Sequence, residues 1–146
     1  MSKLSEKLPG TWQLESRRDV SESGEPRIDP TLGADPIAIL FYDRTGHFSA
    51  QFMKRDRTEA TPEATVAGAN NSRAVGGYDA YFGRFKVDDA TGEVTQVLLG
   101  SLSRENVGMT VTRVMDVDGD TLTIRLGTTA ITGEPVTRTL IWKRVG

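Results

Sequence analysis

The sequence predicts an all-β fold in which eight antiparallel strands, each joined to the next along the chain, close into an up-and-down barrel. Two observations support this prediction. Short runs of β-branched and aromatic residues recur along most of the chain, separated by Gly, Asp, Asn and Pro, which is the pattern of strands and turns. Several of these turns are short, and a meander of consecutive hairpins loses its exposed edges when it closes into a barrel.

Eight runs have strand character, and three of the turns between them have hairpin chemistry. The turns are 43–46, with Gly46 at its end, 88–92, which carries Gly92, and Asp118-Gly119, a strong hairpin dipeptide. An eight-stranded barrel is wide enough to hold one small ligand. The predicted strands cover residues 10–19, 36–43, 47–53, 80–87, 93–101, 109–117, 121–126 and 136–145.

Two connections are longer than the hairpin turns. Residues 21–35 are rich in Ser, Gly, Pro and Glu, and residues 55–78 begin with charged residues. Within the second connection, Thr61-Pro62-Glu63-Ala64 is typical of an N-cap followed by a first helical turn, so we expect one short helix there. Connections of this length are lids, binding loops or disordered segments. We expect lids.

Length and composition exclude several classes of function. A chain of 146 residues can bury about two-thirds of its unfolded surface, so residues 1–146 are expected to form one domain. The 18 basic and 20 acidic residues form no basic cluster, which argues against a nucleic-acid partner. Without Cys there is no disulfide, thiolate zinc site or cysteine nucleophile. No segment has the apolar length of a signal peptide or a membrane span, so we expect a cytoplasmic protein without a membrane partner.

The two ends of the chain carry a matching pair of motifs. Gly10 and Trp12 open the first predicted strand, and Trp142 and Arg144 lie in the last one. This resembles the calycin arrangement, in which the first-strand Trp packs across the barrel floor beneath a basic side chain. The resemblance implies that residues 4–8 form a short helical plug. An Arg stacked on an indole is worth about 0.5–2 kcal/mol, so the role of this pair is structural.

Further motifs extend the resemblance to the whole chain, which is similar to the bacterial and fungal lipocalin-like domain family, small barrels often encoded beside biosynthetic or catabolic enzymes. That family usually carries His where this chain has Gln96, so a proton-transfer role of that His cannot be carried over. The matching segments are residues 10–14, 40–51, 80–85, 100–102 and 106–108, with Arg113 and Trp142.

The face of each strand that points into the lumen decides which residues could meet a ligand, because side chains alternate between faces. If the turn at 43–46 pairs Tyr42 with His47, then Tyr42 shares a face with Ser49, Gln51 and Met53. The opposite face, with Phe48, Ala50 and Phe52 among others, is more apolar, and hydrophobicity alone would place it inside. The family resemblance implies instead that the Tyr42 face is luminal, and we follow it here.

The same alternation on the later strands completes a polar set inside an apolar lumen. Arg113 shares a face with Met109, Val111 and Met115, and a buried Arg needs a partner or a bound anion. The expected ligand contacts are Tyr42, Ser49, Gln51, Met53, Tyr81, Phe85, Gln96, Leu98, Met109 and Arg113. Buried Tyr and Gln also form hydrogen-bond networks that serve only the fold, and Met is commonly core filler. Both alternatives stay open.

No metal or cofactor is expected. His47 is the only histidine, and its place directly after Gly46 is typical of an exposed strand end. One His and no Cys leave only carboxylates as further metal ligands. Residues 116–120 lack the later Gly and the distal Glu of a calcium loop, and turn geometry alone accounts for them.

Three functions fit these features. The first is a barrel that binds a small hydrophobic, oxygenated metabolite. The second, allowed by the resemblance, is a cofactor-free cyclase or isomerase of a biosynthetic pathway with a polyketide- or terpenoid-like substrate. In it Tyr81 and Arg113 would be catalytic, and the barrel would hold a reactive conformer. The third is a barrel packed solid with side chains, whose mouth or edge forms a homodimer.

Overall fold

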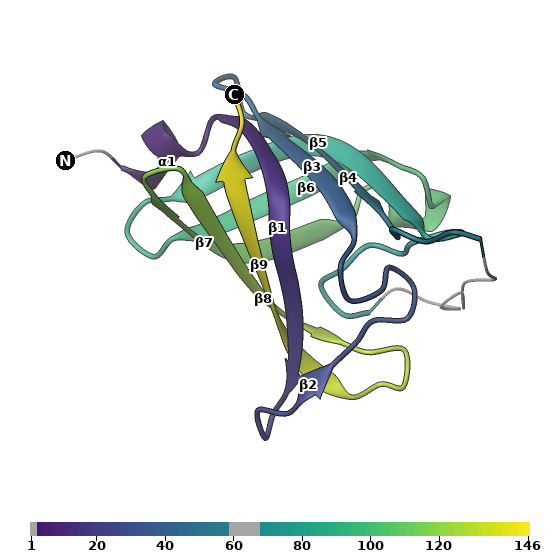
Figure 1. The fold of residues 1–146 in the computed structure, drawn as a ribbon. Helices are drawn as coiled ribbons and strands as arrows, with labels where there is room; N and C mark the ends of the chain where they lie inside the picture. The colour runs from purple at the N-terminus through teal and green to yellow at the C-terminus, as the bar shows by residue number, and fades with distance from the viewer. Residues whose placement is uncertain (1–2, 59–67) are drawn as a thin grey trace.

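The computed structural model describes residues 3–58 and 68–146. Eight antiparallel strands close into a barrel, and a ninth, two-residue strand pairs with the rim end of the first (Figure 1). The barrel order is β1-β3-β4-β5-β6-β7-β8-β9, and pairing of β1 with β9 closes the sheet. The strands are β1 (Gly10–Ser21), β2 (Pro26–Arg27), β3 (Ile37–Tyr42), β4 (His47–Met53), β5 (Tyr78–Asp88), β6 (Glu93–Ser101), β7 (Thr110–Asp118), β8 (Thr121–Thr129) and β9 (Pro135–Arg144).

All eight predicted strands are confirmed, and two of them have the predicted bounds, β4 and β6. The other strand ends move by one to three residues. The strand β2 and a 3-10 turn, η1 (Arg104–Asn106), were not predicted. The helix expected near Thr61 falls in residues 59–67, which lie outside the described residues. In the described part of the chain, no helix is long and apolar enough to span a membrane.

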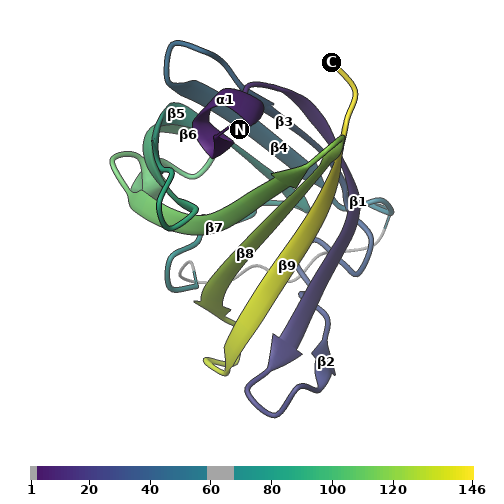
Figure 2. The same cartoon turned by 90° about the vertical axis from the view of Figure 1, so that its left-hand side faces the viewer.

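One end of the barrel is closed by the chain termini, as the resemblance implied. The helix α1 (Leu4–Lys7) lies at this end, and β2 lies at the opposite end (Figures 1 and 2). Trp12 is fully buried and donates from Nε1 to the Leu8 carbonyl at 3.0 Å. The Arg144 guanidinium lies 4.2 Å from the centre of the Trp12 ring. This Trp–Arg pair forms the barrel floor, so ligand access has to come from the other end.

The turn between β3 and β4 corrects the predicted register. Tyr42 pairs with Phe48 instead of His47, because Asp43 organises a longer turn. Its carboxylate accepts the backbone N–H groups of Thr45 and His47 at 2.9 and 2.8 Å. A shift of one residue moves every side chain of a strand to the other face. Tyr42 therefore shares the inner face with Phe48, Ala50 and Phe52. Hydrophobicity alone had indicated the inner face of β4 correctly but not that of β3, whereas the resemblance had indicated that of β3 correctly but not that of β4. His47 is exposed as expected.

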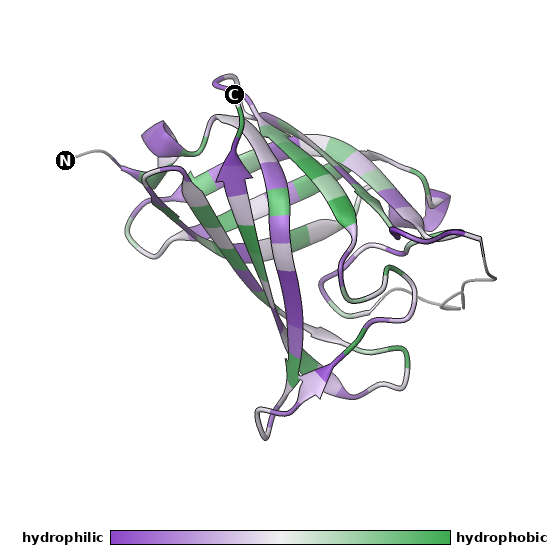
Figure 3. Ribbon diagram, viewed as in Figure 1, coloured by the Kyte–Doolittle hydropathy of each residue, from purple (hydrophilic) through white to green (hydrophobic). Residues whose placement is uncertain are grey.

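A second irregularity lies in β1. The pairing of β1 with β9 shifts by one residue between Leu14 and Ser16. Trp12 points inward before this bulge, whereas Arg17 and Asp19 point inward after it. Hydrophobic and hydrophilic residues alternate along the barrel strands (Figure 3). Because the bulge shifts this alternation by one residue, it turns charged side chains of β1 into the lumen toward the β2 end.

Candidate functional site

The barrel encloses a cavity of about 440 Å³ above the Trp12 floor. All eight barrel strands contribute to its wall, and so do both long connections, through residues 27–32 and through Gly68 and residues 71–74. The third function considered above requires an interior packed solid with side chains, and this cavity does not fit that requirement. The apolar residues that the barrel strands contribute to the wall are Leu40, Ala50, Phe52, Ile124, Leu126, Leu140 and Trp142.

Four of the predicted polar residues meet in this cavity: Tyr42, Tyr81, Gln96 and Arg113. Their side chains come from β3, β5, β6 and β7, and each residue is at most 8% exposed. The Tyr42 hydroxyl donates to Gln96 Oε1 at 2.5 Å. Burial raises the pKa of both tyrosines, so both phenols are neutral at physiological pH.

Arg113 is the charged member of this group of four residues. Its Nη1 donates to the carbonyl oxygens of Asn70 and Thr112 at 2.8 and 2.9 Å, and its guanidinium lies beside the Tyr81 hydroxyl. Among the described residues, no carboxylate lies within 4.0 Å of it. Burial lowers the pKa of Arg113, but a guanidinium stays protonated in proteins. The group thus presents a buried positive charge beside a phenol.

Three predicted contacts lie elsewhere, because the prediction placed them on the wrong face. Ser49, Gln51 and Met53 point outward from β4 as a result of the Tyr42–Phe48 register, and none of them lines the cavity. Gln51 instead accepts a hydrogen bond from the Tyr78 hydroxyl at 2.7 Å on the outer surface.

Three further predicted contacts point inward but pack in the core outside the cavity lining. Phe85 meets the Tyr42 ring edge to face, with the ring centres 4.9 Å apart. Leu98 is 1% exposed. Met109 packs against the same core, with its sulfur 3.9 Å from the Asn106 amide nitrogen. Their contacts in the described structure are those of core residues.

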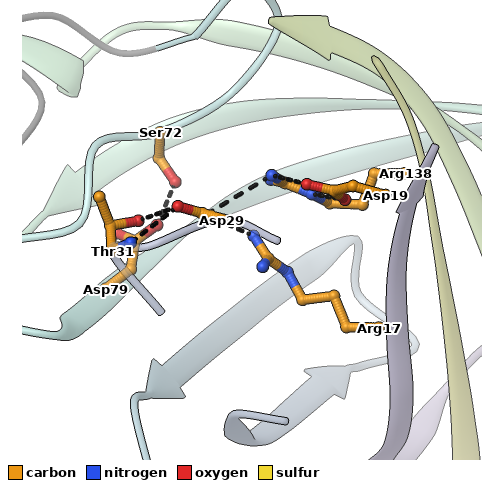
Figure 4. Close-up of polar contacts among 7 residues, drawn as sticks. All are labelled: Arg17, Asp19, Asp29, Thr31, Ser72, Asp79 and Arg138. Atoms are coloured by element: carbon orange, nitrogen blue, oxygen red, sulfur yellow. Dashed lines mark hydrogen bonds and ion pairs between the residues drawn. The ribbon is translucent and has the colours of Figure 1, made fainter. Parts of the chain in front are cut away.

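A cluster of buried ion pairs lies near the β2 end of the cavity, and sequence reasoning missed it. We call Arg17, Asp19, Asp29 and Arg138 the mouth cluster (Figure 4). Arg138 makes a two-pronged contact with Asp19 at 2.8 and 2.9 Å. Asp29, from the connection after β2, accepts from Arg17 at 3.0 Å and lies 3.5 Å from Arg138. These pairs bind the 28–35 segment to the barrel wall.

Electrostatics within the mouth cluster favour the ionised form of Asp29. Desolvation acts to raise the pKa of Asp29, but Arg17, Thr31 and Arg138 together outweigh it, so its pKa is lowered. Burial lowers the pKa of Arg17, and Asp29 and Asp19 oppose this effect. Both Asp29 oxygens are occupied, because Oδ1 accepts the backbone and hydroxyl protons of Thr31.

Asp79 is a buried carboxyl of a different kind. It is 4% exposed, and its Oδ2 accepts a hydrogen bond from the Ser72 hydroxyl at 2.5 Å (Figure 4). Its Oδ1 has no hydrogen-bond partner in the described structure, and neither has Nε1 of Trp142, a second residue of the cavity wall. Burial raises the pKa of Asp79 to about 6. Buried polar atoms are normally satisfied, so these two atoms mark places where a bound molecule would find partners.

The sequence held a partial signal for these missed residues. Asp79 lies two positions before Tyr81, so extending the predicted strand by one residue would have placed it in the lumen. The bulge in β1 hid Arg17 and Asp19, because counting alternate residues from Trp12 places both outside. No group of three or more His, Asp or Glu in the described residues could hold a metal ion.

The chain was compared with curated proteins and with models of protein families. A search of the curated proteins found no match. The model of the lipocalin-like domain family, in contrast, matches residues 9–145, which is nearly the entire sequence. Together with the closed eight-stranded barrel, this match shows that the chain belongs to the lipocalin-like domain family.

Proposed function

We propose that this protein binds one small hydrophobic, oxygenated metabolite inside its barrel. The observation that carries the proposal is the composition of the cavity. It has a volume of about 440 Å³, a largely apolar wall and a few polar groups that point into it. Ligand sites typically have volumes of about 300–1,000 Å³ and this mixture of apolar and polar lining.

The energetics of such a complex are modest. A micromolar dissociation constant corresponds to about −8 kcal/mol. Burial of an apolar ligand contributes about 25 cal/mol for each Å² removed from water, and two or three directed hydrogen bonds add specificity. The free Trp142 Nε1 and Asp79 Oδ1 are available for such bonds.

Native mass spectrometry of freshly purified protein, followed by titration with a panel of hydrophobic fluorophores, tests the proposal. We expect a co-purified ligand mass or a fluorophore that binds one to one. The variant Arg113→Met should weaken binding of acidic fluorophores at least tenfold. The matched variant Arg125→Met alters an exposed Arg on the outer face of β8 and should leave binding unchanged. An empty barrel that binds no fluorophore would show that the proposal is wrong.

A cofactor-free isomerase or cyclase is the second candidate. The observation that favours it is the pairing of Arg113 with the Tyr81 hydroxyl inside the cavity. Two donors beside each other can stabilise negative charge as it develops on a carbonyl oxygen, and loss of one such donor typically costs 100–1,000-fold in rate. This candidate fails if Tyr81→Phe and Arg113→Met both leave conversion of a bound substrate unchanged.

A further inference from the structure

One carboxylate oxygen in the cavity is free to react. Asp19 and Asp29 direct both of their oxygens to Arg or Thr donors. Asp79 accepts the Ser72 hydroxyl at Oδ2, and its Oδ1 has no hydrogen-bond partner among the described residues although the side chain is buried. Of the three cavity aspartates, Asp79 is therefore the one able to accept a proton without breaking an ion pair.

The same carboxylate is connected to the donors that face the lumen. Ser72 donates to Asp79 Oδ2 at 2.5 Å, and the Tyr81 hydroxyl lies beside both Ser72 and Arg113. Asp79 and Tyr81 line the same cavity. Asp79 and Tyr81 also share one face of β5.

Side chains two positions apart on one strand face are about 7 Å apart, and this spacing suits a ketone that lies between them. In a ketone, the oxygen and the α-carbon are about 2.4 Å apart, and each needs a contact of about 3 Å to its partner on the protein. A carbonyl held by Tyr81 and Arg113 would thus bring its α-carbon to Asp79 Oδ1. The surrounding Phe52, Ala50 and Leu40 suit the hydrocarbon part of such a molecule.

We propose that Asp79 is the acid–base residue of an isomerase activity in this cavity, and that the substrates are hydrophobic carbonyl compounds with an acidic α C–H. The proposal rests on the proposed binding of an oxygenated metabolite. It identifies the reaction class for the second candidate function and adds the residue that this function lacked.

The reaction needs no oxidant or reductant. Asp79 Oδ1 takes the α-proton, the C–H electron pair forms the carbon–carbon double bond, and the carbonyl π pair moves to oxygen. Arg113 and the Tyr81 hydroxyl, which can rotate away from Ser72, hold the enolate oxygen. Asp79 then returns the proton to the γ-carbon of a β,γ-unsaturated ketone, giving the conjugated isomer. In a saturated ketone the proton returns to the α-carbon.

Hydrogen exchange of a bound ketone tests the inference. The full chain is incubated in D₂O with enolisable ketones that fit the cavity, β-tetralone and 3-cyclohexenone first. ¹H NMR follows both binding and loss of the α-proton signal. We expect exchange at least 100-fold faster than in buffer for the ketones that bind. Compared at saturating ketone, Asp79→Asn should remove this acceleration, since general bases contribute about 10²–10⁴-fold.

Two matched variants separate chemistry from folding. Asp116→Asn changes an exposed Asp on the outer face of β7, and Tyr78→Phe removes an outward hydroxyl from the strand that carries Tyr81. Both should exchange like the parent chain, whereas Tyr81→Phe should lose at least tenfold.

The pH dependence gives a readout that a structural role would not produce. The groups facing Asp79 are the Ser72 hydroxyl, the backbone N–H of Ala80, the guanidinium groups of Arg17 and Arg138, and the Tyr81 hydroxyl. None of these side chains ionises or loses its charge between pH 5 and 8. Exchange should therefore rise with pH to a plateau with one midpoint near 6, and Asp79→Asn should show no such midpoint.

The outcomes are distinguishable. Ketones that bind but exchange no faster than with Asp79→Asn would overturn the inference and leave the binding function intact. If no enolisable ketone binds while other hydrophobic compounds do, the proposed substrate class is wrong. If nothing binds, the proposed function fails and the inference fails with it.

Discussion

At the scale of single residues, the cavity contains aspartates whose environments are opposite. Asp19 and Asp29 face guanidinium groups, whereas the bonded partner of Asp79 is a hydroxyl. Removing a carboxylate from water is costly, and a nearby opposite charge compensates this cost far better than a neutral donor does. Burial therefore raises the pKa of Asp79, while Arg17 helps to lower that of Asp29. A role in binding or catalysis is therefore expected at Asp79, whose buried charge is compensated less fully than that of Asp29.

The raised pKa of Asp79 predicts a pH-dependent gain in stability for Asp79→Asn. The folded-state pKa of about 6 lies above the ordinary value of 3.8, so the proton favours the folded state. The parent chain loses stability as pH rises from about 4 to about 6, and the loss stays complete above 6. Asp79→Asn removes this penalty and should be more stable at pH 7.5 by up to about 3 kcal/mol.

Urea unfolding at pH 4.5 and 7.5 measures this effect. The gain should shrink toward pH 4, where Asp79 is protonated in the folded chain and already partly protonated in the unfolded chain. Asp116→Asn on the exposed face of β7 is the control and should show no difference between the two pH values. A gain of equal size at both pH values would mean that ionisation of Asp79 does not limit stability.

At the scale of secondary structure elements, two shifts of one residue decide which side chains reach the lumen. Strand positions could be predicted because β-branched runs and Gly or Asp turns are local signals. Faces could not, because the Asp43 turn adds one residue to the β3–β4 connection and a bulge adds one to β1. Tyr42, Tyr81, Gln96 and Arg113 were placed correctly on strands or strand segments without such a shift. Ser49 and Arg17 lie beyond one.

The register of β4 predicts that two neighbouring substitutions differ in their effect on ligand binding. Ala50 is 1% exposed and lines the cavity, whereas Ser49 points outward. Ala50→Leu adds three carbons to the wall of the lumen and should weaken binding of a fluorophore at least tenfold. Ser49→Leu should leave binding unchanged. Fluorescence titration decides, and the reverse order of effects would contradict the observed register.

The connection after β2 depends on the mouth cluster for its position. Asp29 is its main anchor, since it bonds Arg17 and approaches Arg138. Removing one partner of a buried ion pair costs about 3–5 kcal/mol when the other stays buried. Here the connection can instead move away and let water reach Arg17. Asp29→Ala should therefore open the segment locally without unfolding the barrel.

Hydrogen–deuterium exchange with mass spectrometry measures this opening. Amide exchange in residues 28–35 should become at least tenfold faster in Asp29→Ala, with β7 and β8 unaffected. Glu25→Ala removes an exposed partner of Arg27 from the turn just before β2 and should have no effect, because surface ion pairs contribute little. Equal exchange in both variants would show that Asp29 does not hold the segment.

At the scale of the whole molecule, barrel closure separates a structural end from a functional end. Pairing of β1 with β9 brings Trp12 opposite Arg144 at the floor and Asp19 opposite Arg138 near the mouth. Both Arg side chains come from one strand, yet one stacks on an indole and the other joins buried carboxylates. The floor could be predicted, because Gly10, Trp12 and Arg144 are recognisable in sequence. The mouth cluster could not, since its partners are 119 residues apart and meet only in the closed barrel.

The floor makes a final prediction about stability. Gly10 has φ of +148°, and a Cβ at this position would lie 2.3 Å from Arg144 Nη1 and 2.9 Å from the Gly146 carbonyl. Gly10→Ala should displace the guanidinium from the Trp12 ring and lower stability by about 1–3 kcal/mol. Gly127→Ala is the control, because its Cβ would meet no atom within 4 Å. Urea unfolding compares the two variants, and fluorophore binding of the folded protein should be equal in both, since the floor lies outside the cavity lining. Loss of binding in folded Gly10→Ala would mean that the floor and the ligand site are coupled and do not act independently.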